Sequence, residues 1–120
     1  MPNILLVEDN LLNQEVAREL LTGAGLAVEV ASNGAIALDR LRESAYELVF
    51  MDLLMPVMDG LAATEAIRKI DALRDLPVIA MTADVMPSDR NRALAAGMND
   101  FVAKPVDPAA LYATLARWIP

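Results

Sequence analysis

Short apolar runs alternate with longer stretches of helical period along the whole chain. The runs occupy residues 4–7, 27–31, 48–51, 77–81 and 101–103. Most are apolar throughout, as is typical of strands covered by helices on both faces. Only the second run alternates, because Glu29 lies in its middle, so we place it at an edge of the sheet.

The stretches between the runs predict five helices, each with a plausible first residue or cap. They begin near Asn10, Ser32 or Asn33, Gly60, Pro87 and Asp107. The first is expected to bury one apolar arc, formed by Leu12, Val16, Ala17, Leu20, Leu21 and Ala24. Strand and helix thus alternate five times, which predicts a parallel sheet with helices on both faces and right-handed crossovers. At this length we expect residues 1–120 to form a single domain.

Composition excludes several classes of function. The 120 residues include 10 Lys and Arg against 17 Asp and Glu, a net charge of −7, and there is no His or Cys. Metal sites of imidazole or thiolate and catalytic sites that use His or Cys are therefore excluded. The acid excess argues against a nucleic-acid surface, and no uncharged stretch approaches the roughly 20 residues of a membrane helix. Without a basic leader at the start, we expect a cytoplasmic domain that contacts neither nucleic acid nor membrane.

Reactive side chains follow four of the five apolar runs. Glu8 and Asp9 follow the first run, Asp52 the third, Thr82 the fourth and Lys104 the fifth. The ligand site of a doubly wound sheet lies beyond the carboxyl ends of its strands. If the strand order is 2-1-3-4-5, the first and third strands are neighbours, and the three carboxylates converge.

Three carboxylates in one crevice repel each other unless a cation neutralises them, and Mg2+ is suited to such oxygen ligands. A carboxylate oxygen can act as a nucleophile toward phosphorus, which would place a phosphoryl group on Asp52 within reach of Lys104 and Thr82. Taken singly, each residue has a simpler explanation as a loop acid, a cap, a strand residue or a surface lysine. Their joint occurrence at successive strand ends favours a phosphoryl site.

Five segments in fixed order carry a family resemblance: VEDN at 7–10, MDLLMPVMDG at 51–60, PVIAMTA at 77–83, AGMNDF at 96–101 and KP at 104–105. In these segments the chain resembles the receiver domain of two-component response regulators and hybrid histidine kinases. The resemblance implies a flavodoxin-like, doubly wound, five-stranded parallel sheet of order 2-1-3-4-5. It also implies a phosphorylation-dependent signalling module that catalyses its own phosphorylation and dephosphorylation, without turning over a conventional small molecule.

The resemblance also assigns expected roles to the strand-end residues. Asp52 would be the phosphoacceptor, and Asp9 and Asp52 would bind Mg2+. Glu8 would contribute to the metal site through water, and Leu54 through its backbone carbonyl.

Other roles implied by the resemblance concern the conformational switch. Thr82 would be the switch hydroxyl, Lys104 its ion-pair partner and Phe101 the switch aromatic, whose ring turns inward on activation. The face formed by the fourth helix, the fifth strand and the fifth helix would then change and act as the output surface. The bond between Lys104 and Pro105 is often cis in the family.

Two neighbouring positions are expected to influence the lifetime of the phosphorylated state. Leu54 and Asp84 lie two residues beyond Asp52 and Thr82, at family positions that influence how water reaches the acyl phosphate. Because Leu54 cannot hydrogen-bond such a water, we expect slow autodephosphorylation. The alternative is that Leu54 merely packs against its neighbours.

Details within the resemblance point to receivers attached to hybrid sensor kinases, notably the pair Asn13 and Gln14 after the acidic residues. A histidine kinase or a histidine phosphotransfer domain is the implied partner, since this chain has no His, and fusion to a hybrid kinase is one arrangement. Leu11 is expected on the polar face of the first helix, where it could contact a phosphotransfer helix. Single exposed leucines are also ordinary on protein surfaces.

Other classes of protein fit less well. A Mg2+-dependent phosphatase with an aspartyl nucleophile usually has that residue at the end of the first strand and a second Asp two positions later. Here the position two residues after Asp52 is Leu54. An interaction domain without chemistry does not explain why all five strand-end groups occur together. A dinucleotide-binding domain would need a Gly-rich loop after the first strand.

Overall fold

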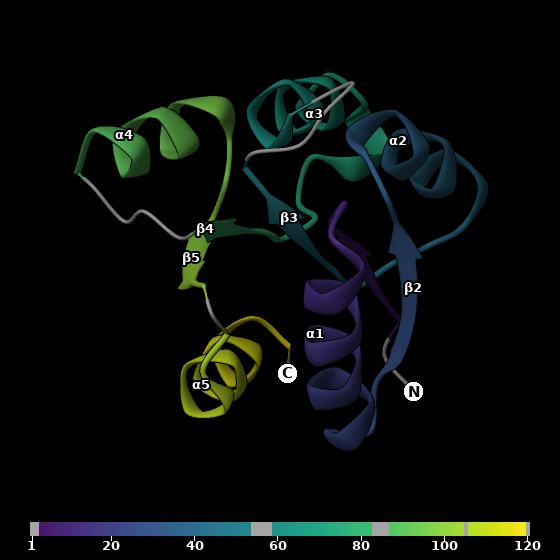
Figure 1. The fold of residues 1–120 in the computed structure, drawn as a ribbon. Helices are drawn as coiled ribbons and strands as arrows, with labels where there is room; N and C mark the ends of the chain where they lie inside the picture. Colours follow the sequence, from purple (N-terminus) through teal and green to yellow (C-terminus); the bar gives the residue numbers. More distant parts are fainter. Residues whose placement is uncertain (1–2, 54–58, 83–86, 105, 120) are drawn as a thin grey trace.

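The chain folds into a five-stranded parallel sheet with helices on both faces (Figure 1). The computed structural model describes residues 3–53, 59–82, 87–104 and 106–119, and for residues 87–89 it describes the backbone only. The strand order is β2-β1-β3-β4-β5, and each neighbouring pair is parallel. The expected fold class and strand order are therefore confirmed.

The bounds of the elements agree with the predicted alternation. The strands are β1 (Asn3–Val7), β2 (Ala27–Ala31), β3 (Leu48–Asp52), β4 (Val78–Thr82) and β5 (Asp100–Ala103). The helices are α1 (Leu11–Gly23), α2 (Gly34–Glu43), α3 (Gly60–Arg68), the 3-10 helix η1 (Asp71–Leu73), α4 (Pro87–Ala96) and α5 (Pro108–Trp118). No helix among the described residues is both long and apolar enough to cross a bilayer.

Two hydrophobic layers hold the sheet between the helices. Helices α1 and α5 cover one face, and α2, α3 and α4 cover the other (Figure 1). Alternate residues of β1 divide between them: Leu5 and Val7 pack on the side of α2 and α3, whereas Ile4 and Leu6 pack on the side of α1 and α5. Both sides of β1 are fully buried, which explains why its sequence is apolar without alternation.

Four helices begin with an acid or amide side chain that accepts a backbone N–H of the first turn. These caps are Asn10 for α1, Asn33 for α2, Asp59 for α3 and Asp107 for α5. Such caps satisfy amide groups that have no partner within the helix. The caps Asn10 and Asp107 lie between β1 and α1 and between β5 and α5, so α1 and α5 begin at the carboxyl edge of the sheet, near the strand-end residues.

The structure corrects several sequence predictions. In α1, Ala17 and Leu21 are buried as expected, but Leu12 is 68% exposed and Val16 is 43% exposed. Together with Met81 and Val106 they line an apolar groove. In α4, Leu94 is likewise 53% exposed.

Smaller differences concern the ends of the elements. Asp52 and Thr82 are the last residues of β3 and β4, whereas the sequence placed them just after those strands. The short helix η1 between α3 and β4 was not predicted. It is one three-residue turn, too short to produce a periodic pattern.

Candidate functional site

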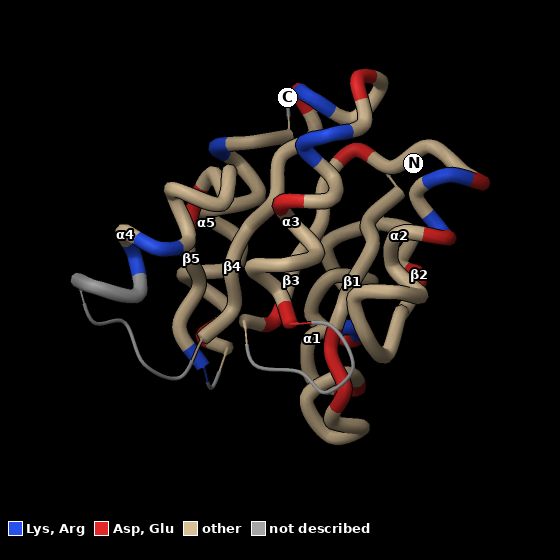
Figure 2. The backbone as a smooth tube through the Cα atoms, turned by 90° about the horizontal axis from the view of Figure 1, so that it is seen from above, with Lys and Arg blue, Asp and Glu red and all other residues tan. Residues whose placement is uncertain are grey.

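The carboxyl ends of the strands form one acidic cleft. Asp52 ends β3, Thr82 ends β4, and Glu8 and Lys104 directly follow β1 and β5. Acidic positions lie close together beyond β1 and β3, with a basic position beyond β5 (Figure 2). The cleft is lined by Glu8, Asp9, Asn10, Asn13, Asp52, Thr82 and Lys104. All five strand-end groups singled out in the sequence are therefore brought together.

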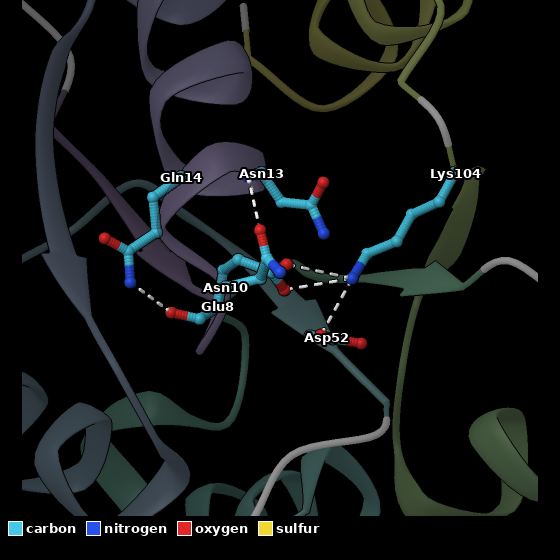
Figure 3. Close-up of polar contacts among 6 residues, drawn as sticks. All are labelled: Glu8, Asn10, Asn13, Gln14, Asp52 and Lys104. Atoms are coloured by element: carbon cyan, nitrogen blue, oxygen red, sulfur yellow. Dashed lines mark hydrogen bonds and ion pairs between the residues drawn. The ribbon is translucent and has the colours of Figure 1, made fainter.

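Lys104 bridges the two buried carboxylates of this cleft (Figure 3). Its Nζ donates to Asp52 Oδ2 at 2.8 Å and to Glu8 Oε1 and Oε2 at 3.1 and 3.0 Å. Glu8 is 1% exposed and Asp52 4% exposed, so both acids lie largely out of contact with water. Burial by itself lowers the pKa of an ammonium, but the bonds to Asp52 and Glu8 outweigh it, and the pKa of Lys104 is raised. The lysine therefore stays charged at neutral pH.

Glu8 is the acid whose ionisation is most perturbed by this environment. Desolvation by burial, together with the neighbouring Asp52, raises the pKa of Glu8 from 4.5 to about 7, although its bonds to Lys104 act in the opposite direction. Two acids on one lysine leave this pair with a negative charge that the ammonium cannot fully offset. A second cation would relieve it.

The donor set fits a divalent metal that prefers oxygen. Glu8, Asp9 and Asp52 each offer a carboxylate oxygen, and these atoms all lie within 4.8 Å of one another. Asp9 is exposed while the other two acids are buried, so the set opens toward solvent on one side. Carboxylates of this number and hardness suit Mg2+, which usually keeps several of its waters.

Gly60 allows α3 to begin directly against the end of β3. A Cβ at position 60 would lie 2.2 Å from the backbone oxygen of Asp52 and 3.0 Å from the Cα of Leu53. The amide of Gly60 donates to the backbone oxygen of Leu53 at 3.2 Å. The position of Asp52 therefore depends on a residue without a side chain at the start of α3.

Phe101 and Leu11 lie outside the acidic cleft. Phe101, in β5, is half-buried against the layer under α2, α3 and α4, and the guanidinium carbon of Arg90 in α4 lies 4.9 Å from the centroid of its ring. Leu11, the first residue of α1, is 75% exposed, as the sequence predicted. Three other residues given roles in the sequence analysis, Leu54, Asp84 and Pro105, lie outside the described residues.

Sequence reasoning missed the contributions of three neutral residues. Asn13 lines the cleft, Gln14 donates from Nε2 to the backbone oxygen of Glu8 at 2.6 Å, and Gly60 makes the close approach to Asp52. The signal for the first two was present, because Asn13 and Gln14 follow the acidic pair within the first turn of a helix. Their spacing alone does not say which carbonyl or carboxylate they contact.

Fold and cleft together define a flavodoxin-like α/β protein with an acidic, lysine-bridged site at the carboxyl ends of its strands. The model of the response regulator receiver domain matches residues 4–116. The chain therefore belongs to the response regulator receiver family, whose members serve two-component and phosphorelay signalling.

Three known proteins illustrate the similarity. Hybrid signal transduction histidine kinase M of Dictyostelium discoideum is 41% identical over 97% of this chain, which spans 5% of the length of that kinase. The receiver domain of sensor histidine kinase PA1611 from Pseudomonas aeruginosa PAO1 has a TM-score of 0.92 and 42% identity, covers 98% of this chain and 97% of that one, and was crystallised with a magnesium ion in its active site cleft.

The third similarity is to a chain in a complex. The co-crystal structure contains the Saccharomyces cerevisiae histidine phosphotransfer protein Ypd1 and the receiver domain of its response regulator Ssk1. The matching chain has a TM-score of 0.92 and 31% identity, and the match covers 98% of this chain and 88% of that one.

Proposed function

We propose that Asp52 accepts a phosphoryl group from a phosphohistidine of a partner domain. The observation that carries this proposal is the buried Asp52 carboxylate, held 2.8 Å from the Lys104 ammonium in a cleft that also contains Thr82. A carboxylate oxygen of Asp52 attacks phosphorus and forms a P–O bond. The P–N bond to the imidazole breaks, and the ring nitrogen keeps its electron pair, so the products are an aspartyl phosphate and a free histidine.

The other groups of the cleft stabilise the transferred group. The Lys104 ammonium and the Thr82 hydroxyl can donate to phosphoryl oxygens as negative charge develops on them. Glu8, Asp9 and Asp52 are the side chains that would hold Mg2+, with the backbone carbonyl of Leu54 as a further expected ligand. When bound, Mg2+ would offset the charge of the acids and of the phosphoryl oxygens.

The partner is proposed to be a histidine kinase or a histidine phosphotransfer domain. An apolar groove lies directly beside the cleft and shares Glu8, Asn13 and Lys104 with it. Leu12 and Val16 line this groove, and Leu11 is exposed at the same end of α1. An amphipathic helix laid on this surface would bring its histidine over Asp52.

Three further parts of the proposal concern the setting of the site. Residues 1–120 act as one receiver domain, either fused to a hybrid kinase or as a separate protein. The domain works in the cytoplasm, a reducing compartment that suits a chain without Cys. Phosphorylation of Asp52 is transmitted through Thr82 and Phe101 to α4, β5 and α5, because α4 reaches the Phe101 ring through Arg90.

Phosphorylation can be tested without knowing the partner. The chain is incubated with Mg2+ and acetyl phosphate, and its intact mass is measured. We expect one added phosphoryl group in the parent and none in Asp52→Asn. Asp107→Asn, which exchanges an acid at the start of α5 for another good cap, should behave like the parent. A parent that neither gains mass nor binds beryllofluoride would refute the proposal, and turnover of diverse phosphate esters would indicate a phosphatase.

Docking is tested separately with a histidine phosphotransfer domain that phosphorylates the parent. We expect Leu11→Lys to slow transfer from that domain at least tenfold while leaving phosphorylation by acetyl phosphate unchanged. Leu94→Lys, a comparable change at an exposed leucine of α4, should transfer at the parent rate. Equal transfer rates in all three proteins would exclude docking at Leu11.

A further inference from the structure

The peptide groups on both sides of Glu8 are fixed by hydrogen bonds from other segments. Its amide donates to the backbone oxygen of Ala31 at 3.0 Å, which continues the pairing of β1 with β2. Its backbone oxygen accepts from Nε2 of Gln14 at 2.6 Å (Figure 3). The first bond comes from the sheet, and the second comes from a single side chain of α1.

Gln14 makes two hydrogen bonds to the short connection between β1 and α1. Its side chain holds the backbone oxygen of Glu8, and its own amide donates to the backbone oxygen of Asn10 at 2.9 Å, which is the first helical bond of α1. Asn10 in turn caps the helix by accepting from the amide of Asn13 at 3.0 Å. Asp9 lies between these two anchored points, so its backbone position relative to Glu8 depends on Gln14.

This arrangement matters because Asp9 and Glu8 belong to the carboxylate cluster. Their oxygens lie within 4.8 Å of each other and of Asp52, although like charges at this distance repel. A connection that could move would let the exposed Asp9 swing away from the two buried acids. Holding the Glu8 carbonyl therefore keeps the three ligand atoms gathered before a cation arrives.

The chemical type of Gln14 suits this task. An amide donates a hydrogen bond to a carbonyl without adding charge, whereas a lysine or arginine at the same position would place a positive charge beside a cation site. Gln14 is half-buried, and it contacts the backbone of Glu8 and not its carboxylate. Its bond to Glu8 therefore occupies no carboxylate oxygen of the cluster.

We propose that Gln14 is a positioning residue for the Glu8 and Asp9 carboxylates and that it strengthens Mg2+ binding without touching the metal. This inference rests on the proposed function, because it takes the cluster to be a Mg2+ site. Groups that orient metal ligands typically change metal affinity by about 10–100-fold when they are removed. A comparable loss is expected here.

The test uses Gln14→Met, which keeps the length of the side chain but removes the donor, and Gln14→Ala. Both substitutions introduce good helix formers, so α1 should remain folded. Titration calorimetry with MgCl2 should give a dissociation constant about 10-fold or more above that of the parent for both variants. Thr22→Met, a change at an exposed neutral position of the same helix, should bind like the parent. A dissociation constant within twofold of the parent in the Gln14 variants would overturn the inference.

A second measurement separates positioning from general damage to the domain. In the acetyl phosphate reaction, the Mg2+ concentration for half-maximal phosphorylation should rise at least tenfold in the Gln14 variants, while the rate at saturating Mg2+ stays within twofold of the parent. A lower maximal rate with unchanged Mg2+ dependence would contradict a role in metal binding. If the parent and Thr22→Met bind no Mg2+, the proposed metal site fails, and the inference fails with it. If they bind it and the Gln14 variants bind equally well, only the inference fails.

Discussion

The ammonium of Lys104 lies 2.8 Å from Oδ2 of Asp52 and within 3.1 Å of both Glu8 oxygens, so one cation serves two buried acids. Lys104→Met would leave these two carboxylates without that cation. Removing one partner of a buried ion pair typically costs about 3–5 kcal/mol, and we expect a loss near the lower end in the free energy of unfolding without metal. Urea denaturation in buffer containing EDTA measures this loss.

Lys69→Met is the matched control for this prediction, because it removes the other lysine of the chain from an exposed position at the end of α3. Its free energy of unfolding should differ from the parent by less than about 0.5 kcal/mol. Equal stability of the two methionine variants would show that Lys104 does not stabilise the acids.

Gly60→Ala should destabilise the domain and disturb the site. The added Cβ would lie 2.2 Å from the Asp52 backbone oxygen, so α3 or the end of β3 must move. We expect a loss of about 1–3 kcal/mol in the free energy of unfolding and slower phosphorylation by acetyl phosphate. Gly23→Ala is the control, since a Cβ there meets nothing within 4 Å, and it should be neutral or stabilising by about 0.5 kcal/mol. If both variants behaved alike in urea, the close approach at Gly60 would be unimportant.

The contact between Arg90 and Phe101 should be measurable as a coupling between α4 and β5. A double-mutant cycle of Arg90→Met and Phe101→Leu should give a coupling energy of about 0.5–1 kcal/mol, as is typical of an exposed cation over an aromatic ring. A second cycle that pairs Phe101→Leu with Arg40→Met, on the exposed side of α2, should give a value near zero. The same coupling in both cycles would mean that the first reports no direct contact.

Tyr46 should ionise at unusually high pH. Its hydroxyl donates to Glu29 Oε2, and burial together with that carboxylate raises the pKa of Tyr46 from 10 to about 12. Because the unfolded chain loses this proton first, the stabilisation is complete below pH about 10 and is lost as the pH rises toward about 12. In Tyr112→Phe, Tyr46 is the sole tyrosine, and its ultraviolet titration should have a midpoint near 12 while circular dichroism remains native. A midpoint near 10 in the folded protein would contradict this.

The layout of the sheet was predictable because burial leaves a direct mark on sequence. In strands covered on both faces, the run from Ile4 to Val7 in β1 and the run from Leu48 to Met51 in β3 are apolar at every position, and an acid follows each run. The edge strand β2 carries Glu29. The convergence of Glu8, Asp9 and Asp52 followed once the strand order was taken as 2-1-3-4-5, the order that the family resemblance implied. The apolar runs depend on regular burial, which a pattern of residues can specify.

The errors concern contacts that geometry alone does not determine. Helical period placed Leu12 and Val16 in one arc with Leu21, but it cannot say which part of that arc other elements cover. Leu21 is buried, whereas Leu12 and Val16 line an open groove. The bond from Gln14 to the Glu8 carbonyl and the absence of space at Gly60 depend on distances between elements. No local pattern contains those distances.

The bridge formed by Lys104 also has a consequence for how the domain matures during synthesis. Glu8 and Lys104 are 96 positions apart, and the described elements between them include the four strands β2 to β5 and the helices α1 to α4. These strands must pair before the lysine can reach the acids. Contacts between such distant segments form late, because closing long loops costs entropy that only later contacts recover. A nascent receiver that lacks β5 therefore has its acids without their cation. Competence for phosphorylation should arise in a single step, when the last strand joins the sheet.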